Sequence, residues 1–225
     1  MRVVLLNPNR SLWITDLMAQ VAREVLHPRE ELDAITSQDG PEVVKTPEQT
    51  GLAAFEIQAM AQRYGANYDA VIVGISLDCG LHSASVALQP KPVIGMTQAA
   101  CLMAGRDGRR FGILTVGSVM QPLYEQHVQA LGLHSSCVGV LAPDCPSAFA
   151  GPGSNTGQEV VDALSLAVED LHSLGAESVV LAGAVLCGLG KQLSQRTGIQ
   201  VWEGPQCAVE MARSRLQQGG KVSQP

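Results

Sequence analysis

The chain has 225 residues, 46% of them hydrophobic and 16% charged, which is the composition of a globular protein with a real core and excludes a disordered one. The formal net charge is −6 and the longest basic run is Arg109-Arg110, so the sequence shows no cationic face for nucleic acid. The N-terminal apolar run Val3 to Leu6 is too short for a signal peptide or a membrane span. Six widely spaced cysteines without a secretion signal then indicate reduced thiols and a cytoplasmic protein.

Strand-like and helix-like segments alternate along the first half. The first strand stops at an Asn-Pro pair, and a segment with apolar residues at helical spacing follows it. The run Ala70 to Ile75 is continuously apolar, as in a strand buried on both faces. This alternation predicts βαβ units and a parallel sheet. The predicted strands cover residues 3–6, 34–35, 70–75 and 93–94, and the predicted helices cover 14–25, 52–63 and a segment from about 98.

The second half repeats the first at a nearly constant offset. A separation of 108 residues relates Arg2 to Arg110, Cys79 to Cys187 and Val93 to Val201. We therefore expect an α/β fold of two pseudosymmetric halves, each a short parallel sheet flanked by helices. Residues 1–96 plus about 205–225 would form the first lobe, and residues 97–204 the second.

This repeat predicts where a ligand would bind. Ligands of open parallel sheets lie beyond the carboxyl ends of the strands, so a cleft between the halves should use strand-end residues from both. Asparagines after the first strand can orient a turn or point an amide at a ligand. Ser118 with Gln121 has the spacing of a capping box, whose helix start can bind an anion. The candidate substrate-binding residues are Asn7, Asn9, Ser76, Asp78, Thr115, Ser118 and Gly183.

Two cysteines are the candidate catalytic groups. Cys79 precedes a predicted short helix, whose N-terminus can stabilise a thiolate, and Cys187 is its counterpart in the second half. Two facing thiols could remove a proton from one side of a carbon and return it from the other, which inverts a stereocentre without a cofactor. The alternative for each is a buried structural thiol. Cys79 and His82 lack the second ligand pair that a zinc site needs, so no metal site is predicted.

Several segments match one known pattern in order and spacing: residues 3–9, 69–73, 78 with 80–81, 92–95, 110–111, 175–177 with 179–181, and 203–204. Through them the sequence resembles the aspartate/glutamate/hydantoin racemase superfamily, and hydantoin racemases in particular, over essentially its whole length. The resemblance implies a cleft between pseudosymmetric lobes and a cofactor-independent reaction that uses one cysteine from each lobe. In the hydantoin racemase pattern those cysteines fall at Ile75 and Gly183, and here a cysteine stands four positions later in each half.

Three hypotheses follow for the function. The first is a racemase or epimerase that acts on a small amino acid, hydantoin or related carboxylic acid through Cys79 and Cys187. The second is a one-cysteine decarboxylase or cis–trans isomerase of the same superfamily, with Cys79 acting alone. The third is a non-catalytic binding protein that retains the cleft. In each case the partner is a small molecule rather than nucleic acid or a membrane, no cofactor is called for, and a homo-oligomer is compatible with the apolar helices.

Overall fold

The computed structural model describes the backbone of residues 1–222 and the side chains of residues 1–219. Its strands form two four-stranded sheets, in the orders β2-β1-β3-β4 and β6-β5-β7-β8, and all six pairings are parallel. The identical order confirms the predicted α/β fold and its internal repeat. The strands are β1 (Arg2–Asn7), β2 (Glu31–Thr36), β3 (Ala70–Val73), β4 (Val93–Gly95), β5 (Phe111–Leu114), β6 (Cys137–Leu141), β7 (Ser178–Leu181) and β8 (Gln200–Glu203).

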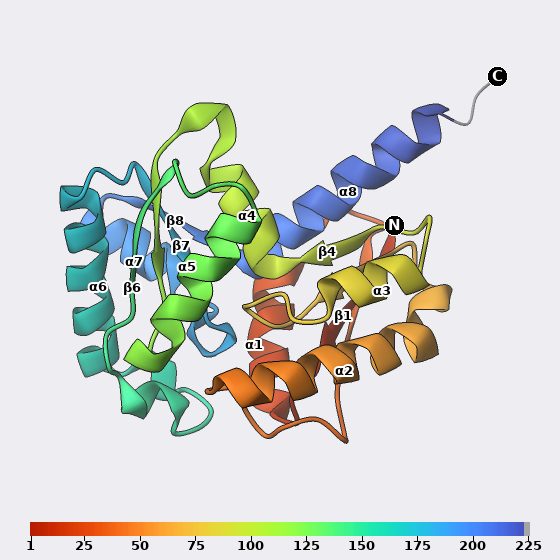
Figure 1. Cartoon of the computed structure of the whole chain (residues 1–225), viewed down its shortest axis with the longest axis horizontal. Coiled ribbons are helices and arrows are strands. Elements are labelled where there is room, and N and C mark those ends of the chain that lie inside the picture. Colours follow the sequence, from red (N-terminus) through yellow and green to blue (C-terminus); the bar gives the residue numbers. More distant parts are fainter. Residues whose placement is uncertain (223–225) are drawn as a thin grey trace.

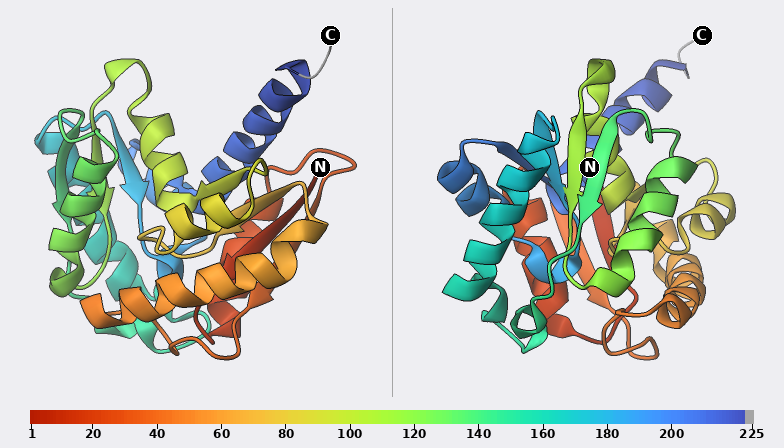
Figure 2. Two further views of the ribbon diagram at one scale, coloured as in Figure 1. Left: turned by 45° about the vertical axis from the view of Figure 1, so that its right-hand side comes forward. Right: turned by 60° about the vertical axis from the view of Figure 1, so that its left-hand side comes forward.

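Helices cover both sheets. Figure 1 shows the lobes side by side, and Figure 2 shows α5 and α6 on opposite faces of the second sheet. The α-helices are α1 (Leu12–Arg23), α2 (Pro47–Tyr64), α3 (Leu81–Ala87), α4 (Met96–Ala104), α5 (Gln121–Ala130), α6 (Gln158–Ser173), α7 (Gly190–Thr197) and α8 (Gly204–Val222). No helix in residues 1–222 is both long and apolar enough to cross a membrane.

Strand β1 lies inside the first sheet, and this position explains its continuous apolar run. Val3 and Leu5 pack into one hydrophobic cluster with α1, α4 and α8, whereas Val4 and Leu6 pack into another with α2 and α3. All four side chains are fully buried, because alternate residues of a strand face opposite sides of its sheet. The first of these clusters continues into the second lobe, where it includes Phe111, and so joins the two lobes.

Two element boundaries differ from the sequence prediction. The second helix begins at Pro47 rather than Leu52, because the Thr46 side chain caps it by accepting the Gln49 N–H and proline is well suited to a first helical position. The third strand ends at Val73 rather than Ile75, because the chain turns there and the Asp78 N–H bonds the Ile75 carbonyl. This turn matters for function, since it forms the loop after β3.

The C-terminal helix α8 contacts α1, α4, β3 and β4 (Figure 1). Arg213 on this helix donates two hydrogen bonds to the Glu30 carboxylate, at 3.0 and 2.7 Å, and a third to the Val25 carbonyl at 2.8 Å. The hydrogen bond with Arg213 lowers the pKa of Glu30 from 4.5 to about 2. The assignment of residues 205–225 to the first lobe and of residue 97 onward to the second stays a prediction, and residues 223–225 lie outside the part of the chain that the structure describes.

We expect the Glu30→Gln variant to be less stable than the wild type at pH 7 by up to about 3 kcal/mol, because it removes a charge-assisted, bidentate pair. Ionised Glu30 contributes this stability above pH 4.5, and the contribution is lost as pH falls towards the folded-state pKa of about 2. Urea unfolding at pH 7 and pH 3 should therefore show a gap between the two proteins that narrows in acid. A gap that is equal at both pH values would contradict the assignment.

Candidate active site

A cavity of about 500 Å³ lies between the two lobes, at the carboxyl ends of the central strands. The loops after β1, β3, β5 and β7 all contribute to its walls, as the repeat predicts. Most of its lining is apolar. The apolar lining residues are Ile14, Val43, Val44, Ile75, Leu77, Val116, Val119, Met120, Pro146, Phe149, Ala184 and Val185.

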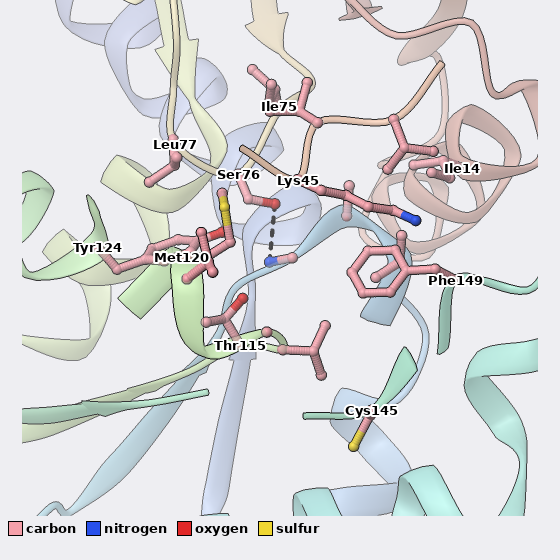
Figure 3. A pocket seen from close by; sticks show the side chains of 18 of the residues that line it. Ile14, Lys45, Ile75, Ser76, Leu77, Thr115, Met120, Tyr124, Cys145 and Phe149 are labelled. Atoms are coloured by element: carbon pink, nitrogen blue, oxygen red, sulfur yellow. Dashed lines mark hydrogen bonds between the residues drawn. The ribbon is translucent and has the colours of Figure 1, made fainter. Parts of the chain in front are cut away.

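Three hydroxyl groups gather on one wall of the cavity. The Ser76 hydroxyl, from the loop after β3, accepts a hydrogen bond of 2.9 Å from the Gly183 N–H of the other lobe. The Thr115 and Tyr124 hydroxyls point to the same region (Figure 3). Burial raises the pKa of Tyr124, although the neighbouring Thr115 and Ser76 side chains act in the opposite direction. Tyr124 therefore stays protonated at neutral pH, and the wall offers neutral hydroxyl donors.

Two loops, one from each lobe, meet at the cavity. The Lys45 ammonium of the first lobe lies 4.4 Å from the centre of the Phe149 ring, which belongs to a 3₁₀ turn of the second lobe, Pro146–Phe149. This is the distance of a cation–π interaction. Asp144, also at the cavity, accepts the Ser118 N–H at 3.0 Å. Among the described lining residues, Lys45 and Asp144 are therefore the only charged ones.

Five of the predicted site residues line this cavity: Asn9, Ser76, Thr115, Ser118 and Gly183. Asn7 does not, because its side chain is fully buried and donates to Asn9 at 3.0 Å and Thr15 at 2.8 Å. Asn7 thus orders the turn after β1 and keeps Asn9 at the cavity. Asp78 does not line it either, because its carboxylate bonds the start of α4.

The capping box predicted at Ser118 is not formed. A 3₁₀ turn spans Ser118–Met120, and α5 begins only at Gln121. The Ser118 N–H donates to Asp144 instead, and the Gln121 side chain bonds Glu125. The Asp144 carboxylate therefore already occupies the backbone amide that the sequence suggested for a bound anion.

The two candidate catalytic cysteines lie outside the cavity lining. Cys79 packs against the cluster of α2 and α3, and burial, assisted by the neighbouring Asp78 charge, raises its pKa to about 12. Cys187 belongs to the larger core cluster, and burial raises its pKa well above the ordinary value. Each follows a lining residue by two positions, Leu77 and Val185 respectively. The structure does not bring the two thiols together at the cavity, and their catalytic role stays a prediction.

A third cysteine, Cys145, does line the cavity. Figure 3 shows its sulfur directed away from the hydroxyl wall. Burial raises its pKa, and the Glu159 and Asp144 charges add to this effect. Among the described side chains, no group of three or more His, Cys, Asp or Glu residues is placed to hold a metal ion.

Glu203 is a buried carboxyl group just behind the site. It lies at the end of β8, is 6% exposed, and accepts the N–H groups of Gly188 and Gly190 at 2.6 and 3.2 Å. Burial raises its pKa from 4.5 to about 7, although the two backbone hydrogen bonds favour the ionised form. Glu203 thus holds the end of the segment that brings Gly183 and Val185 to the cavity.

Comparison with known proteins shows the relationship directly. The family model for Asp/Glu/hydantoin racemases matches residues 3–212. The chain belongs to this racemase family. It is 29% identical to hydantoin racemase of Rhizobium meliloti, over 99% of this chain and 92% of the relative, and 25% identical to that of Paenarthrobacter aurescens, over 99% and 94%.

Solved structures of the family agree. Allantoin racemase from Klebsiella pneumoniae superposes with a TM-score of 0.88 at 27% identity, over 97% of this chain and 89% of that one. Allantoin racemase from Pseudomonas fluorescens gives a TM-score of 0.85 at 28% identity, over 97% and 92%. Together with the family match, these relatives support a cofactor-independent, racemase-like isomerase.

The two positions that the sequence analysis predicts for the family's cysteines both lie at the cavity. Ile75 and Gly183, at those positions in the hydantoin racemase pattern, both line the cavity and come from opposite lobes. Gly183 has a φ of +118°, and a Cβ added there would lie 3.3 Å from the Thr115 hydroxyl oxygen. The racemase cleft is therefore retained around a hydroxyl wall.

Several lining residues were not found from the sequence. In the sequence, Tyr124 looks like an ordinary buried residue of an amphipathic helix, and only its hydroxyl group distinguishes it from other core residues. Lys45 and Phe149 lie in loops that no motif marks, and they meet only because the lobes face each other. The repeat could have suggested the opposing loops, but not which side chains on them reach the cavity.

We expect Cys79 to resist alkylation, because burial raises its pKa to about 12 and leaves almost no thiolate at neutral pH. Iodoacetamide labelling followed by mass spectrometry from pH 6 to 10 should show a rate at pH 8 at least about a hundredfold below that of free cysteine. Early labelling of Cys79, with an apparent pKa below 8.5, would contradict this prediction and indicate a thiolate at this position.

We expect Glu203 to make the wild type less stable as pH rises. Its folded-state pKa is raised, so its favourable contribution is complete below pH 4.5 and is lost as pH passes about 7. The loss amounts to roughly 3 kcal/mol. Urea unfolding at pH 5 and pH 8 should show that Glu203→Gln, whose side chain does not titrate, loses less stability across this interval. Parallel curves for the two proteins would refute the assignment.

Proposed function

We propose that this isomerase binds a small acid, amino acid or hydantoin-like ring in the inter-lobe cavity and inverts a carbon beside a carbonyl or carboxylate group. The observation that carries the proposal is the hydroxyl wall of Ser76, Thr115 and Tyr124 at the strand ends of a racemase-family cleft. Inversion at such a carbon passes through an enolate-like state, whose oxygen gains negative charge. Preorganised donors at that oxygen stabilise this state more than the ground state.

The apolar walls support a substrate with an apolar substituent. Ile75, Met120 and Phe149 surround the space in front of the hydroxyl wall (Figure 3). A charged or ureido-bearing substituent would lose its hydration there without gaining partners, which is costly. A ring or acid with a benzyl or branched alkyl group would gain from burial instead. We therefore choose 5-benzylhydantoin as the first substrate to test.

Proton transfer is the part of the reaction that the cavity lining supports least. The proposal keeps Cys79 and Cys187 as candidates, because each lies two residues beyond a lining residue. A movement of both loops would be needed to bring their sulfur atoms to the substrate. The one-cysteine decarboxylase or cis–trans isomerase would need such a movement only at Cys79.

A second candidate function is a non-catalytic small-molecule binding protein. The feature in its favour is the predicted replacement of both family cysteines by Ile75 and Gly183, which both line the cavity. Binding and catalysis differ in one measurable respect, which is whether the carbon-bound proton exchanges with solvent.

The activity test uses enantiopure 5-benzylhydantoin in D₂O. We expect loss of optical activity and deuterium incorporation at the ring carbon, both faster than the spontaneous reaction and both abolished in the Cys79→Ser, Cys187→Ser double variant. Full activity in that double variant would remove the thiols from the mechanism. Thermal stabilisation by the ligand without any exchange above the spontaneous rate would favour the binding protein.

The hydroxyl wall is tested separately. We expect Ser76→Ala and Tyr124→Phe each to lower kcat/KM by about ten- to a hundredfold, because each removes a donor from the developing negative charge. Ser173→Ala, an exposed change at the end of α6, serves as the matched control and should leave the rate unchanged. Wild-type kcat/KM in both wall variants would show that the substrate oxygen binds elsewhere.

A further inference from the structure

We propose that His127 is a positioning residue of this site: through Asp78 it fixes the loop after β3 that presents Ser76 to the cavity. The proposal rests on the proposed function in one respect, since Ser76 is there assigned to the substrate. No sequence motif marks His127. Its role follows from contacts on the side of the loop that faces away from the cavity.

Backbone N–H groups at the start of α4 hold the Asp78 side chain. Its carboxylate is 1% exposed and accepts the backbone N–H groups of Thr97 at 3.1 Å and Gln98 at 2.7 Å. Both amides belong to the first turn of α4, where the helix dipole favours a negative charge. The Thr97 hydroxyl in turn donates to the Ser76 carbonyl. Asp78 therefore links the loop after β3 to the start of α4.

His127 reaches the same carboxylate from the other lobe. Its Nε2 lies 2.9 Å from Asp78 Oδ2. In the tautomer with the proton on Nε2, the ring donates this bond to the carboxylate. His127 stands on α5, which packs against β6 of the second sheet. The bond is thus a direct connection between the lobes, and its carboxylate is shielded from water.

Helix α5 contacts both sides of the loop. His127 and Tyr124 are three residues apart, so they project from the same face of the helix. His127 bonds Asp78 behind the loop, while Tyr124 meets Ser76 at the cavity. The second lobe therefore bonds both ends of the segment 76–78: His127 bonds Asp78, and the Gly183 N–H donates to Ser76.

The backbone of the loop needs this support. Asp78 has a φ of +52°, in the left-handed region that residues other than glycine adopt rarely. Such conformations persist where the surrounding contacts determine them and are common at ligand sites. When the His127 bond is lost, we expect the loop to relax and Ser76 to leave its hydrogen bond with Gly183.

The test compares three single variants. His127→Leu removes the donor at similar volume, His127→Gln places an amide N–H near the position of Nε2, and His134→Leu changes an exposed histidine in the turn between α5 and β6 as the matched control. Amide hydrogen exchange, resolved by NMR, reports on the Gly183, Thr97 and Gln98 N–H groups without any need for activity. We expect their exchange to be at least tenfold faster in His127→Leu, restored in His127→Gln, and unchanged in His134→Leu.

Either of two exchange results would overturn the proposal. One is unaltered exchange at Gly183 in His127→Leu. The other is failure of His127→Gln to restore it, which would assign the effect to shape rather than to the donated bond.

Turnover of 5-benzylhydantoin completes the test. We expect kcat/KM to fall at least tenfold in His127→Leu, mainly through kcat, and to recover in His127→Gln. Normal kcat/KM in a variant with a loosened loop would also overturn the positioning role. A wild type that turns over no substrate would instead count against the proposed function, and the exchange data would still decide whether His127 fixes the loop.

Discussion

A hydrogen bond between the two lobes, from the Gly183 N–H to the Ser76 hydroxyl, sets the geometry on which the rest of the site depends. It joins the loop after β3 to the loop after β7 and so fixes the distance between the two walls of the cavity. The cleft is therefore organised by a backbone N–H that donates to a hydroxyl group, and most of its lining is apolar.

Each lobe braces its strand-end loop with a buried carboxylate, but the two lobes place that carboxylate differently. In the first lobe Asp78 lies in the loop after β3 and bonds the backbone that follows β4. In the second lobe Glu203 lies at the end of β8 and bonds the backbone of the segment after β7. In both halves a buried carboxyl group thus links the segment after the third strand to the end of the fourth strand. In the first lobe the carboxyl group belongs to the former segment, and in the second lobe it belongs to the latter. Backbone amides are the partners in both cases, so the contact tolerates change in the surrounding side chains.

The sequence predicts the fold well and the site in part. Continuous apolar runs identify β1 and β3 because burial on both faces leaves no polar positions, and the offset of 108 residues reveals the repeat. Strand ends then locate the cavity and five of its lining residues. The side chain that faces the cavity is not predictable in the same way, since it depends on local turns such as the left-handed Asp78. That turn directs Leu77 to the cavity and Asp78 away from it, and Cys79 packs against α2 and α3.

The larger core cluster runs without a break from the first lobe into the second on the side of α1, α4 and α8. A chain of half this length would leave that surface open to water, and it could cover it only by pairing with a second copy about a two-fold axis. Once the two copies are fused, the symmetry no longer constrains the sequence. Equivalent positions in the two halves can then hold different residues, as Ile75 and Gly183 do. One cavity wall can therefore change chemically while the other stays the same.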